Sequence, residues 1–393
     1  MVFNAYTEPA SKGHFLYNVK MAGRERSLRS QTTRDAIISF ALNDIAIVGV
    51  DGLSVTSLIK SAGITRPTFY SYFGDIDGLI AEIWIDRGRF WIETMAAQGE
   101  FDLRDDATIF GLTEIFISAQ RSDELRAVVS AGLAQFIEDS SDDVGTLATM
   151  MWRIANRIGV VGTQRVWPTV TDALFLDSFL DSLGARTIKA GITIVDELPV
   201  IELEESAVVE ANIARGVIQI VGRGGVAGLS VLRLGRILRV TSGYINPRIH
   251  GLRELVGTTY ALVQDSVARQ NVGLWKLWNL TPRGFARFIV GSLGGSRQSW
   301  RIFRNEVLVA SAHDPELAAL VSASMDSLVA IVGSRVSGFG YSGRVTARMS
   351  ILVHTMLFGF STLAIAGVRV DQLAHEGVID ALLKELATRK FRI

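Results

Sequence analysis

Cysteine is absent from all 393 positions of the chain, which excludes disulfides, thiolate nucleophiles, iron–sulfur clusters and cysteine-ligated zinc. Histidine is scarce, with five residues and no HxxH or HExxH spacing, so we expect no metal site. Lysine plus arginine and aspartate plus glutamate number 40 each. This balance argues against a polybasic protein, although it leaves room for a local basic patch.

Proline is also scarce, with seven residues, whereas 48% of the residues are hydrophobic. The apolar residues mostly follow a helical spacing, and alternating strand-like runs are few, so we predict an all-α protein with a large core. The sequence contains no Ser/His/Asp arrangement, no cluster of metal-binding residues and no intact phosphate loop. We therefore name no catalytic residues, expect no cofactor and do not predict an enzyme.

Long apolar runs are rare. Residues 1–17 contain none, so a secretory signal is not supported and we expect a cytoplasmic protein. Residues 351–368 are apolar enough to compare with a membrane span. The run is short for a span and contains His354, Thr355, Ser361 and Thr362. These features favour a buried helix, and we expect no membrane association.

An internal repeat is present. The residues that form one helical face between positions 37 and 45 return when 176 is added to each number: Ile37, Ile38, Ala41, Leu42 and Ile45 become Ile213, Ala214, Val217, Ile218 and Val221. Gly52-Leu-Ser-Val55 returns as Gly228-Leu-Ser-Val231. Further along, Asp123-Glu-Leu125 resembles Pro315-Glu-Leu317 at an offset of 192. The repeat predicts a tandem duplication whose later parts have diverged in length.

The duplication sets the expected domains. The acidic stretch around Pro199 is interpreted as a linker between two similar units. We expect a flexible basic arm (1–31), head 1 (32–84), body 1 (85–195), the linker (196–206), head 2 (207–260) and body 2 (261–393). The arm carries Arg24, Arg26 and Arg29, and Met21 is a second possible start.

Head 1 contains a helix-turn-helix pattern. Ser54 is a predicted N-cap for a helix over 55–62, and Gly63 supplies the positive φ that ends it. Thr65 caps the next helix, which has Pro67 in its first turn and reaches Phe73. Leu58, Ile64, Phe69 and Phe73 are predicted to point inward. This leaves outward a set of side chains able to bond phosphates and base edges, namely Arg66, Thr68, Tyr70, Ser71 and Tyr72.

The string Gly63-Ile-Thr-Arg-Pro-Thr-Phe-Tyr-Ser-Tyr-Phe73, with Leu58-Ile-Lys-Ser-Ala62 before it, resembles the TetR family of transcriptional regulators. The resemblance covers about 50 residues, from Thr32 to Trp84. It implies a three-helix DNA-binding head on a helical ligand-binding and dimerisation body. It also implies that Thr65, Arg66, Thr68, Tyr70, Ser71 and Tyr72 face DNA, although Tyr70 and Tyr72 could instead pack on the following helix.

The first head departs from the family in charge. Ile76 stands where the family usually has a phosphate-contacting lysine, and Asp75 and Asp77 flank it. Residues 32–80 hold three basic and five acidic side chains. We therefore expect weak DNA affinity from this head alone, unless the arginines of the arm contribute.

Head 2 departs further. Arg239, Asn246 and Pro247 replace Gly63, Tyr70 and Ser71, and a proline inside a helix costs about 3 kcal/mol. This head is nevertheless rich in arginine, at positions 215, 223, 233, 236, 239, 248 and 253. Two interpretations remain open. Head 2 is either a degenerate relic whose arginines form intramolecular pairs, which we favour, or a surface that grips phosphates without reading bases.

The bodies are rich in aromatic residues and methionine, which can form an ordinary core or enclose an apolar ligand. No ligand-binding residues can be named. The resemblance implies that residues 143–163 with 170–190, and 342–367 with 371–388, form dimerisation helices. Fusing two units then predicts an intrachain pseudo-dimer, and further association of two chains into a homodimer remains open.

The leading hypothesis is a DNA-binding transcriptional repressor whose partners are double-stranded DNA and an apolar small molecule that relieves repression. The alternative is a small-molecule-binding protein of the same fold that has lost specific operator binding. Ile76, the acidic first head and the degraded second head favour this alternative.

Overall fold

The structure is a computed structural model that describes residues 28–102, 107–140, 144–183, 198–204, 209–277, 282–336, 344–369, 378 and 381. Within these residues the regular secondary structure is helical and no strand occurs, which confirms the all-α prediction. Several predicted features lie outside the described residues: the arm up to residue 27, the outer ends of the linker and almost all of the last predicted helix, 371–388.

The first half begins with a long helix and a compact pair of short ones. The elements are α2 (Leu28–Val48), the 3₁₀ turn η1 (Val50–Gly52), α3 (Val55–Ala62), α4 (Arg66–Phe73) and α5 (Ile76–Ala96). The start of α2 corrects the predicted boundary of the arm, because residues 28–31 are helical. No glycine or proline interrupts residues 24–48, so the helix extends back beyond the repeat-derived start.

The rest of the first half forms a helical body. It contains α6 (Ala107–Ser118), η2 (Ala119–Arg121), α7 (Asp123–Ser140), α8 (Val144–Thr163), η3 (Pro168–Leu174) and α9 (Phe175–Leu183). Trp84, Trp91 and Phe116 form an aromatic cluster at its centre, with ring centroids 4.8–5.6 Å apart. All three rings are buried, so α5 and α6 are fixed to each other by the core.

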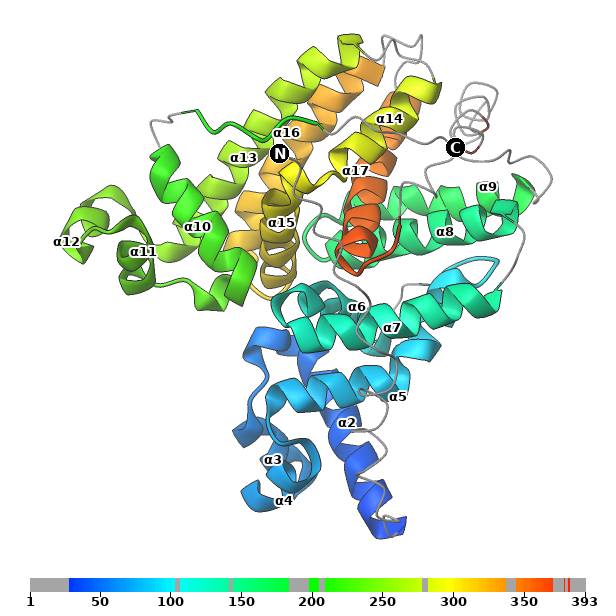
Figure 1. Ribbon diagram of the computed structural model, residues 1–393, viewed down its shortest axis with the longest axis vertical. Helices are drawn as coiled ribbons and strands as arrows, with labels where there is room; N and C mark the ends of the chain where they lie inside the picture. The colour runs from blue at the N-terminus through cyan, green and yellow to red at the C-terminus, as the bar shows by residue number, and fades with distance from the viewer. Residues whose placement is uncertain are drawn as a thin grey trace, which may run out of the picture.

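The second half follows a similar order of elements. It contains α10 (Ala211–Gly224), η5 (Val226–Gly228), α11 (Val231–Leu238), α12 (Ser242–Ile245), η6 (Asn246–Arg248), α13 (Leu252–Leu277), α14 (Pro282–Ser292), η7 (Gly295–Arg297), α15 (Gln298–Ser311), α16 (Pro315–Val336) and α17 (Arg344–Ile365). The short helices α3 and α4 lie at the lower left of Figure 1, and α11 and α12 lie apart from them at the left.

Helices α8 and α17 pack directly against each other where the two halves meet (Figure 1). Their backbones come so close that a Cβ atom on Gly159 would lie 2.3 Å from the carbonyl oxygen of Thr355. In the same way, a Cβ atom on Gly359 would lie 1.8 Å from the carbonyl oxygen of Ala155. Only glycine fits at these two positions without moving one helix away from the other.

This packing places the apolar run of residues 351–368 in the interior, since Ile351, Met356 and Phe360 are buried. In the part of the chain that the structure describes, we find no helix with the length and apolar character needed to cross a membrane.

Two ion pairs join the halves beside the α8–α17 contact. Arg121, after α6, donates from Nε to Glu306 on α15 at 2.7 Å and also pairs with Asp51. His313, after α15, contacts Glu114 on α6 through Nε2 at 2.7 Å. The side chain of Glu306 is fully buried. Burial raises the pKa of Glu306, although Arg121 and Gln120 act in the opposite direction.

The described part of the linker, residues 198–204, is irregular and lies along the second half. Leu198 and Pro199 accept hydrogen bonds from Ser296 Oγ at 2.6 Å and from Arg297 Nε at 3.1 Å. Glu202 accepts one from Gln270 Nε2 at 3.2 Å. Side chains of the second half therefore hold this segment in place.

Candidate nucleic-acid interface

The first helix of the candidate interface, α3, begins and ends as its sequence predicts. Ser54 Oγ accepts a hydrogen bond from the amide of Ser57 at 3.1 Å, which caps the helix start. Gly63 follows the helix with φ 62°, in the left-handed region that glycine adopts without strain. The turn then delivers the chain to Thr65, where α4 begins.

Helix α4 is held against the head by aromatic residues on one side. Phe69 and Phe73 are buried together with Leu58 of α3. At the start of α4, Thr65 Oγ1 accepts from the amide of Thr68 at 3.4 Å, and Pro67 sits in the first turn. The buried face and the cap together fix which side of α4 is left toward solvent.

The solvent side carries most of the predicted DNA-facing residues. Thr65, Arg66, Tyr70 and Ser71 are exposed, and Thr68 is half-buried. Tyr70 is 48% exposed, and its ring packs edge-on against that of Phe69, with ring centroids 5.6 Å apart. Tyr70 therefore has a fixed ring on an accessible surface, which suits a hydrogen bond to a phosphate or a base edge.

Tyr72 is less exposed than the outward prediction requires, and its position is nearer to the alternative that it packs against the head. It is half-buried and packs against the hydrophobic core, with its ring 5.9 Å from that of Phe73. A helix turns by about 100° per residue, so Tyr72 lies at the boundary between the buried and exposed faces. Its ring helps to seat α4.

The polar groups of this surface are already ordered. Arg66 Nη2 donates to Thr56 Oγ1 on α3 at 3.1 Å, and Ser71 Oγ donates to the carbonyl oxygen of Thr68 at 2.7 Å. The Arg66 guanidinium has five N–H donors, and this contact uses one of them. The remaining donors can bind a phosphate or a guanine edge.

The positive charge of this head is smaller than its sequence suggests. Arg34 is bound by Glu82 at 2.5 Å and lies 3.7 Å from Asp86. Burial acts to lower the pKa of Arg34, but the bond to Glu82 and the neighbouring carboxylates raise it above its usual value. Glu82 and Asp86 therefore compensate the charge of Arg34. Lys60 on α3 and Arg66 on α4 are exposed basic residues.

The start of α5 also lacks a positive charge. Asp75 Oδ1 accepts from the amide of Gly78 at 2.7 Å and so caps the helix. Ile76, at the position where the resemblance implies a lysine, is half-buried and packs against the core. The helix dipole at this end can still attract a phosphate, but Asp75 and Asp77 oppose it.

In the second half, α11 is as long as α3, whereas α12 is shorter than α4. Helix α11 has a Ser230 cap with a 3.2 Å bond from the amide of Arg233. Among the described residues, Arg239 is the one non-glycine residue with positive φ, at 58°. Helix α12 spans four residues, has no side-chain cap bond from Thr241, and gives way to the 3₁₀ turn that contains Pro247.

The arginines near α12 are partly engaged within the chain. Arg248 Nε donates to Glu210 at 2.8 Å, and its guanidinium lies 3.8 Å from the ring centroid of Tyr244. Arg253 pairs with Asp314 at 2.6 Å and also with Glu316. Arg236 and Arg239 are exposed, and no described residue forms an ion pair with them.

Residues 37–83 match the family described as bacterial regulatory proteins, tetR family. No curated protein matches the chain. The matched segment runs from within α2 to the first part of α5 and includes the whole α3–turn–α4 unit. The match supports a DNA-binding transcriptional regulator of the TetR family.

Sequence reasoning did not find the Arg34–Glu82 bond, and it left open whether Tyr72 lies outward or packs against the head. The sequence gives no direct signal for this bond, because Arg34 on α2 and Glu82 on α5 are 48 residues apart. No local sequence pattern decides between the two positions of Tyr72, because its half-burial depends on how α4 packs against the rest of the head.

Proposed function

We propose that this protein is a transcriptional repressor that binds double-stranded DNA through α4 and is released from it by a small molecule. The capped α3–Gly63–α4 unit carries the proposal, because it presents polar side chains on a rigid helix whose other face is buried. Such a helix can enter the major groove with its N-terminal residues against the bases.

The roles of the individual residues follow from where they lie. Arg66, at the start of α4, is suited to read a base edge or bind a phosphate. Thr65, Thr68, Tyr70 and Ser71 offer hydroxyl groups that suit phosphate contacts. Tyr72 would support the helix from its half-buried position, with its edge toward DNA.

We also propose that the chain is a tandem duplication whose second head is degenerate. Adding 176 to the residue numbers relates the bounds of η1 and α3 to those of η5 and α11. It also relates Gly63 to Arg239, the two left-handed residues that end the helices. The four-residue α12, against the eight-residue α4, supports the relic interpretation of head 2. The boundaries 32–84 and 207–260 remain our proposed heads.

Support for an intrachain pseudo-dimer comes from contacts that exchange under the repeat. Adding 192 relates Glu114 to Glu306 and Arg121 to His313. The Arg121–Glu306 pair therefore has its counterpart in the His313–Glu114 pair. Such reciprocity is the property of an isologous two-fold interface, in which residue i contacts j and j contacts i.

The helix crossing has the same property at an offset of 200. This offset relates the starts of α8 and α17, Val144 and Arg344. It also relates the approach of Gly159 to Thr355 to the approach of Ala155 to Gly359. Two independent contacts thus favour a fused pair of TetR-like units over a chance meeting of unlike bodies.

A second candidate function is a small-molecule-binding protein that no longer recognises an operator. The neutralised Arg34, the apolar Ile76 and the shortened α12 favour it, because each reduces binding to the phosphate backbone. The two functions differ in whether the protein prefers one DNA sequence over others.

Fluorescence titration of labelled DNA separates the two functions. The target is the DNA upstream of the protein's own coding sequence, with a scrambled duplex of equal length as the control, each at several salt concentrations. A repressor should bind the target at least about a thousandfold more tightly than the control. Equal and steeply salt-dependent binding of both duplexes, or no binding, would favour the ligand-binding function.

A further inference from the structure

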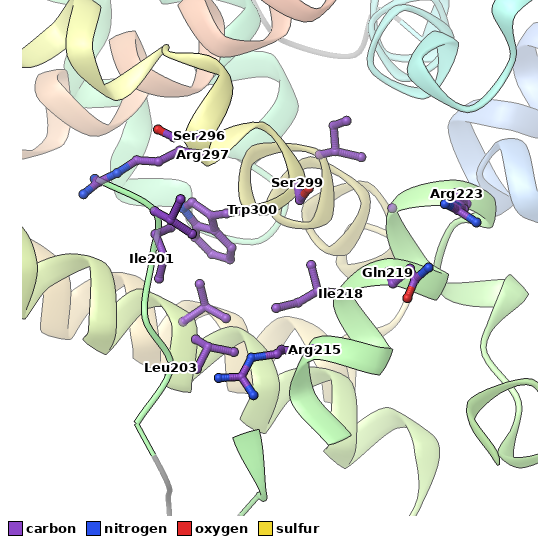
Figure 2. A pocket seen from close by; sticks show the side chains of 14 residues that line it. Ile201, Leu203, Arg215, Ile218, Gln219, Arg223, Ser296, Arg297, Ser299 and Trp300 are labelled. Atoms are coloured by element: carbon purple, nitrogen blue, oxygen red, sulfur yellow. The ribbon is translucent and has the colours of Figure 1, made fainter. Parts of the chain in front are cut away.

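The second half contains a cavity of about 590 Å³ that the DNA-facing surface does not explain. The linker segment 198–204, α10, α13 and α15 contribute its walls (Figure 2). Its volume falls within the range of about 300–1,000 Å³ that is usual for small-molecule sites. The residues that line the cavity determine the chemical class of ligand that it can bind.

One part of the lining is apolar and rigid. Ile201 and Leu203 of the linker, Ile218 of α10 and Trp300 of α15 contribute apolar side chains. The Trp300 ring is fixed from behind by Tyr260 and Phe303, with ring centroids 5.8 and 5.9 Å away. A flat hydrocarbon or aromatic body can therefore lie against a wall that needs no rearrangement.

The charged part of the lining has one sign. Arg215, Arg223 and Arg297 line the cavity, and none of the described lining residues is acidic. Arg215 and Arg223 are exposed on α10, and Arg215 Nη1 bonds to Asn212 Oδ1 at 2.8 Å. Across the cavity from Arg215, Ser296 and Ser299 add hydroxyl groups (Figure 2).

Arg297 is the most informative of the three because it is buried. Its side chain donates to Pro199 and to Asn271 Oδ1, at 3.1 and 2.9 Å, while Nη2 is buried without a hydrogen-bond partner. Burial lowers the pKa of Arg297 to about 10. A buried cation with a free donor and no described carboxylate partner creates a positive site that an anion would stabilise.

We propose that this cavity binds a small organic anion with an apolar body, such as an aromatic or alkyl carboxylate or sulfonate. The arginines would hold the acid group, and the Trp300 wall would hold the body. That such binding regulates DNA affinity rests on the proposed function, whereas the binding itself does not. The expected effector is therefore an amphipathic anion and not a purely apolar molecule.

The chain should hold one such site. At the offset of 176, Arg215 and Arg223 correspond to Ser39 and Ile47 in the first half. At the offset of 192, Trp300 corresponds to Thr108. Neither the positive charges nor the aromatic wall is repeated, so the expected stoichiometry is one anion per chain.

A pair of fluorescent probes tests the charge requirement on the full chain. The anionic probe is 8-anilinonaphthalene-1-sulfonate, and the neutral probe is N-phenyl-1-naphthylamine, which has the same rings without the sulfonate. Arg215→Gln and Arg223→Gln should each weaken the sulfonate about tenfold, which is about 1.4 kcal/mol, and leave the neutral probe unchanged. Arg236→Gln, on exposed α11 outside the cavity, is the matched control.

A cavity-filling variant tests the location. Ser299 is exposed at the cavity wall, so Ser299→Trp can occupy the space without disturbing the core. Ser299→Trp should abolish binding of both probes. Ser327→Trp, at an exposed position on α16 outside the cavity, should leave binding unchanged. Circular dichroism confirms that each variant is folded.

Two results would overturn the proposal: unchanged probe binding in folded Ser299→Trp, or equal behaviour of the arginine variants and the Arg236 control. Failure of the DNA titration, with intact and cavity-dependent sulfonate binding, would instead refute the proposed repressor and leave the anion site in place.

Discussion

At the residue scale, the same backbone position is filled by different side chains in the two halves. Gly63 and Arg239 both end a short helix in the left-handed region, with φ 62° and 58°. An L-residue with a Cβ atom pays about 1–2 kcal/mol there, whereas glycine does not. The second turn has therefore kept its geometry despite an unfavourable residue.

This difference predicts opposite effects of two substitutions. Arg239→Gly should stabilise the protein by about 0.5–1 kcal/mol, because relief of strain exceeds the greater chain entropy of glycine in the unfolded state. Gly63→Ala should destabilise it by about 1 kcal/mol through strain alone, since no atom lies within 4 Å of the added Cβ. Urea unfolding measures both, and destabilisation by Arg239→Gly would show that the Arg239 side chain makes a stabilising contact.

The proposed reading helix gives a second prediction at this scale. Arg66→Ala should weaken specific DNA binding by about 1–3 kcal/mol and relax discrimination at one base pair, if Arg66 reads a base edge. Tyr70→Phe keeps the ring against Phe69, so it should lower affinity modestly for all sequences. Both effects are measured by titration with specific and scrambled duplexes.

Ser242→Ala and Asn246→Ala provide the matched controls on α12 and η6, and both should have little effect. A larger loss from these two variants than from Arg66→Ala would assign the working surface to head 2. No change in any of the four folded variants would favour the ligand-binding function.

At the element scale, the local pattern determined where helices begin and end. The predicted helix 55–62 is confirmed, because Ser54, Gly63 and their neighbours act within a few residues of one another. The predicted end of α4 at Phe73 is confirmed for the same reason. Pro247 was expected to disrupt its helix, and α12 ends at Ile245, two residues before it.

Contacts between distant segments could not be predicted in this way. The Gly159 and Gly359 crossing joins residues on α8 and α17, and each glycine lies in an ordinary helical sequence. The resemblance implied that residues 143–163 and 342–367 form dimerisation helices, and α8 and α17 do contact each other. The sequence did not indicate which faces of these two helices meet. The pairing of Arg34 was missed, and the position of Tyr72 was left open, because both depend on tertiary packing.

The crossing itself predicts a large effect from a single methyl group. Gly359→Ala places a Cβ 1.8 Å from a backbone oxygen that cannot rotate away, so α8 and α17 must separate. We expect a loss of about 1–3 kcal/mol or more in the free energy of unfolding. Gly159→Ala should act similarly, at 2.3 Å.

Gly132→Ala on α7 is the control, because its Cβ would meet Trp84 at an ordinary 3.6 Å. Alanine is the better helix former by about 0.8–1 kcal/mol, so this variant should be neutral or more stable. If thermal unfolding gave all three variants the same stability, the close approach of α8 and α17 would be disproved.

At the scale of the whole molecule, the His313–Glu114 pair between the halves makes the stability of the protein depend on pH. Both ring nitrogens of His313 face acceptors, Glu114 at 2.7 Å and the carbonyl oxygen of Ile47 at 3.1 Å. Two donated bonds require the protonated ring. Burial and Arg165 act to lower the pKa of His313, but the bond and the charge of Glu114 outweigh them and raise it.

A histidine whose pKa is raised on folding stabilises the protein fully below its unfolded pKa of about 6.5, and this contribution disappears as pH rises through the folded value. His313→Gln keeps one hydrogen bond to Glu114 but cannot be charged. The difference in unfolding free energy between wild type and His313→Gln should therefore be largest below about pH 6.5 and shrink above it. The same substitution at the exposed residue His250 is the control. If urea unfolding gave a difference between wild type and His313→Gln that did not change with pH, the charged His313–Glu114 pair would be contradicted.

The proposed pseudo-dimer makes a last prediction about the DNA site. A symmetric pair of identical heads reads both halves of a palindrome equally, because each half-site meets the same helix. Here α4 has eight residues and α12 has four, so one chain presents two unequal surfaces. We expect one half-site to be strongly sensitive to base substitution and the other to tolerate it.

Footprinting on systematically mutated DNA, with sedimentation to count chains per complex, measures this directly. Two equally sensitive half-sites bound by one chain would refute the asymmetry. Two equal half-sites bound by two chains would show instead that the first heads of separate chains pair on DNA, which would move the functional dimer from within the chain to between chains.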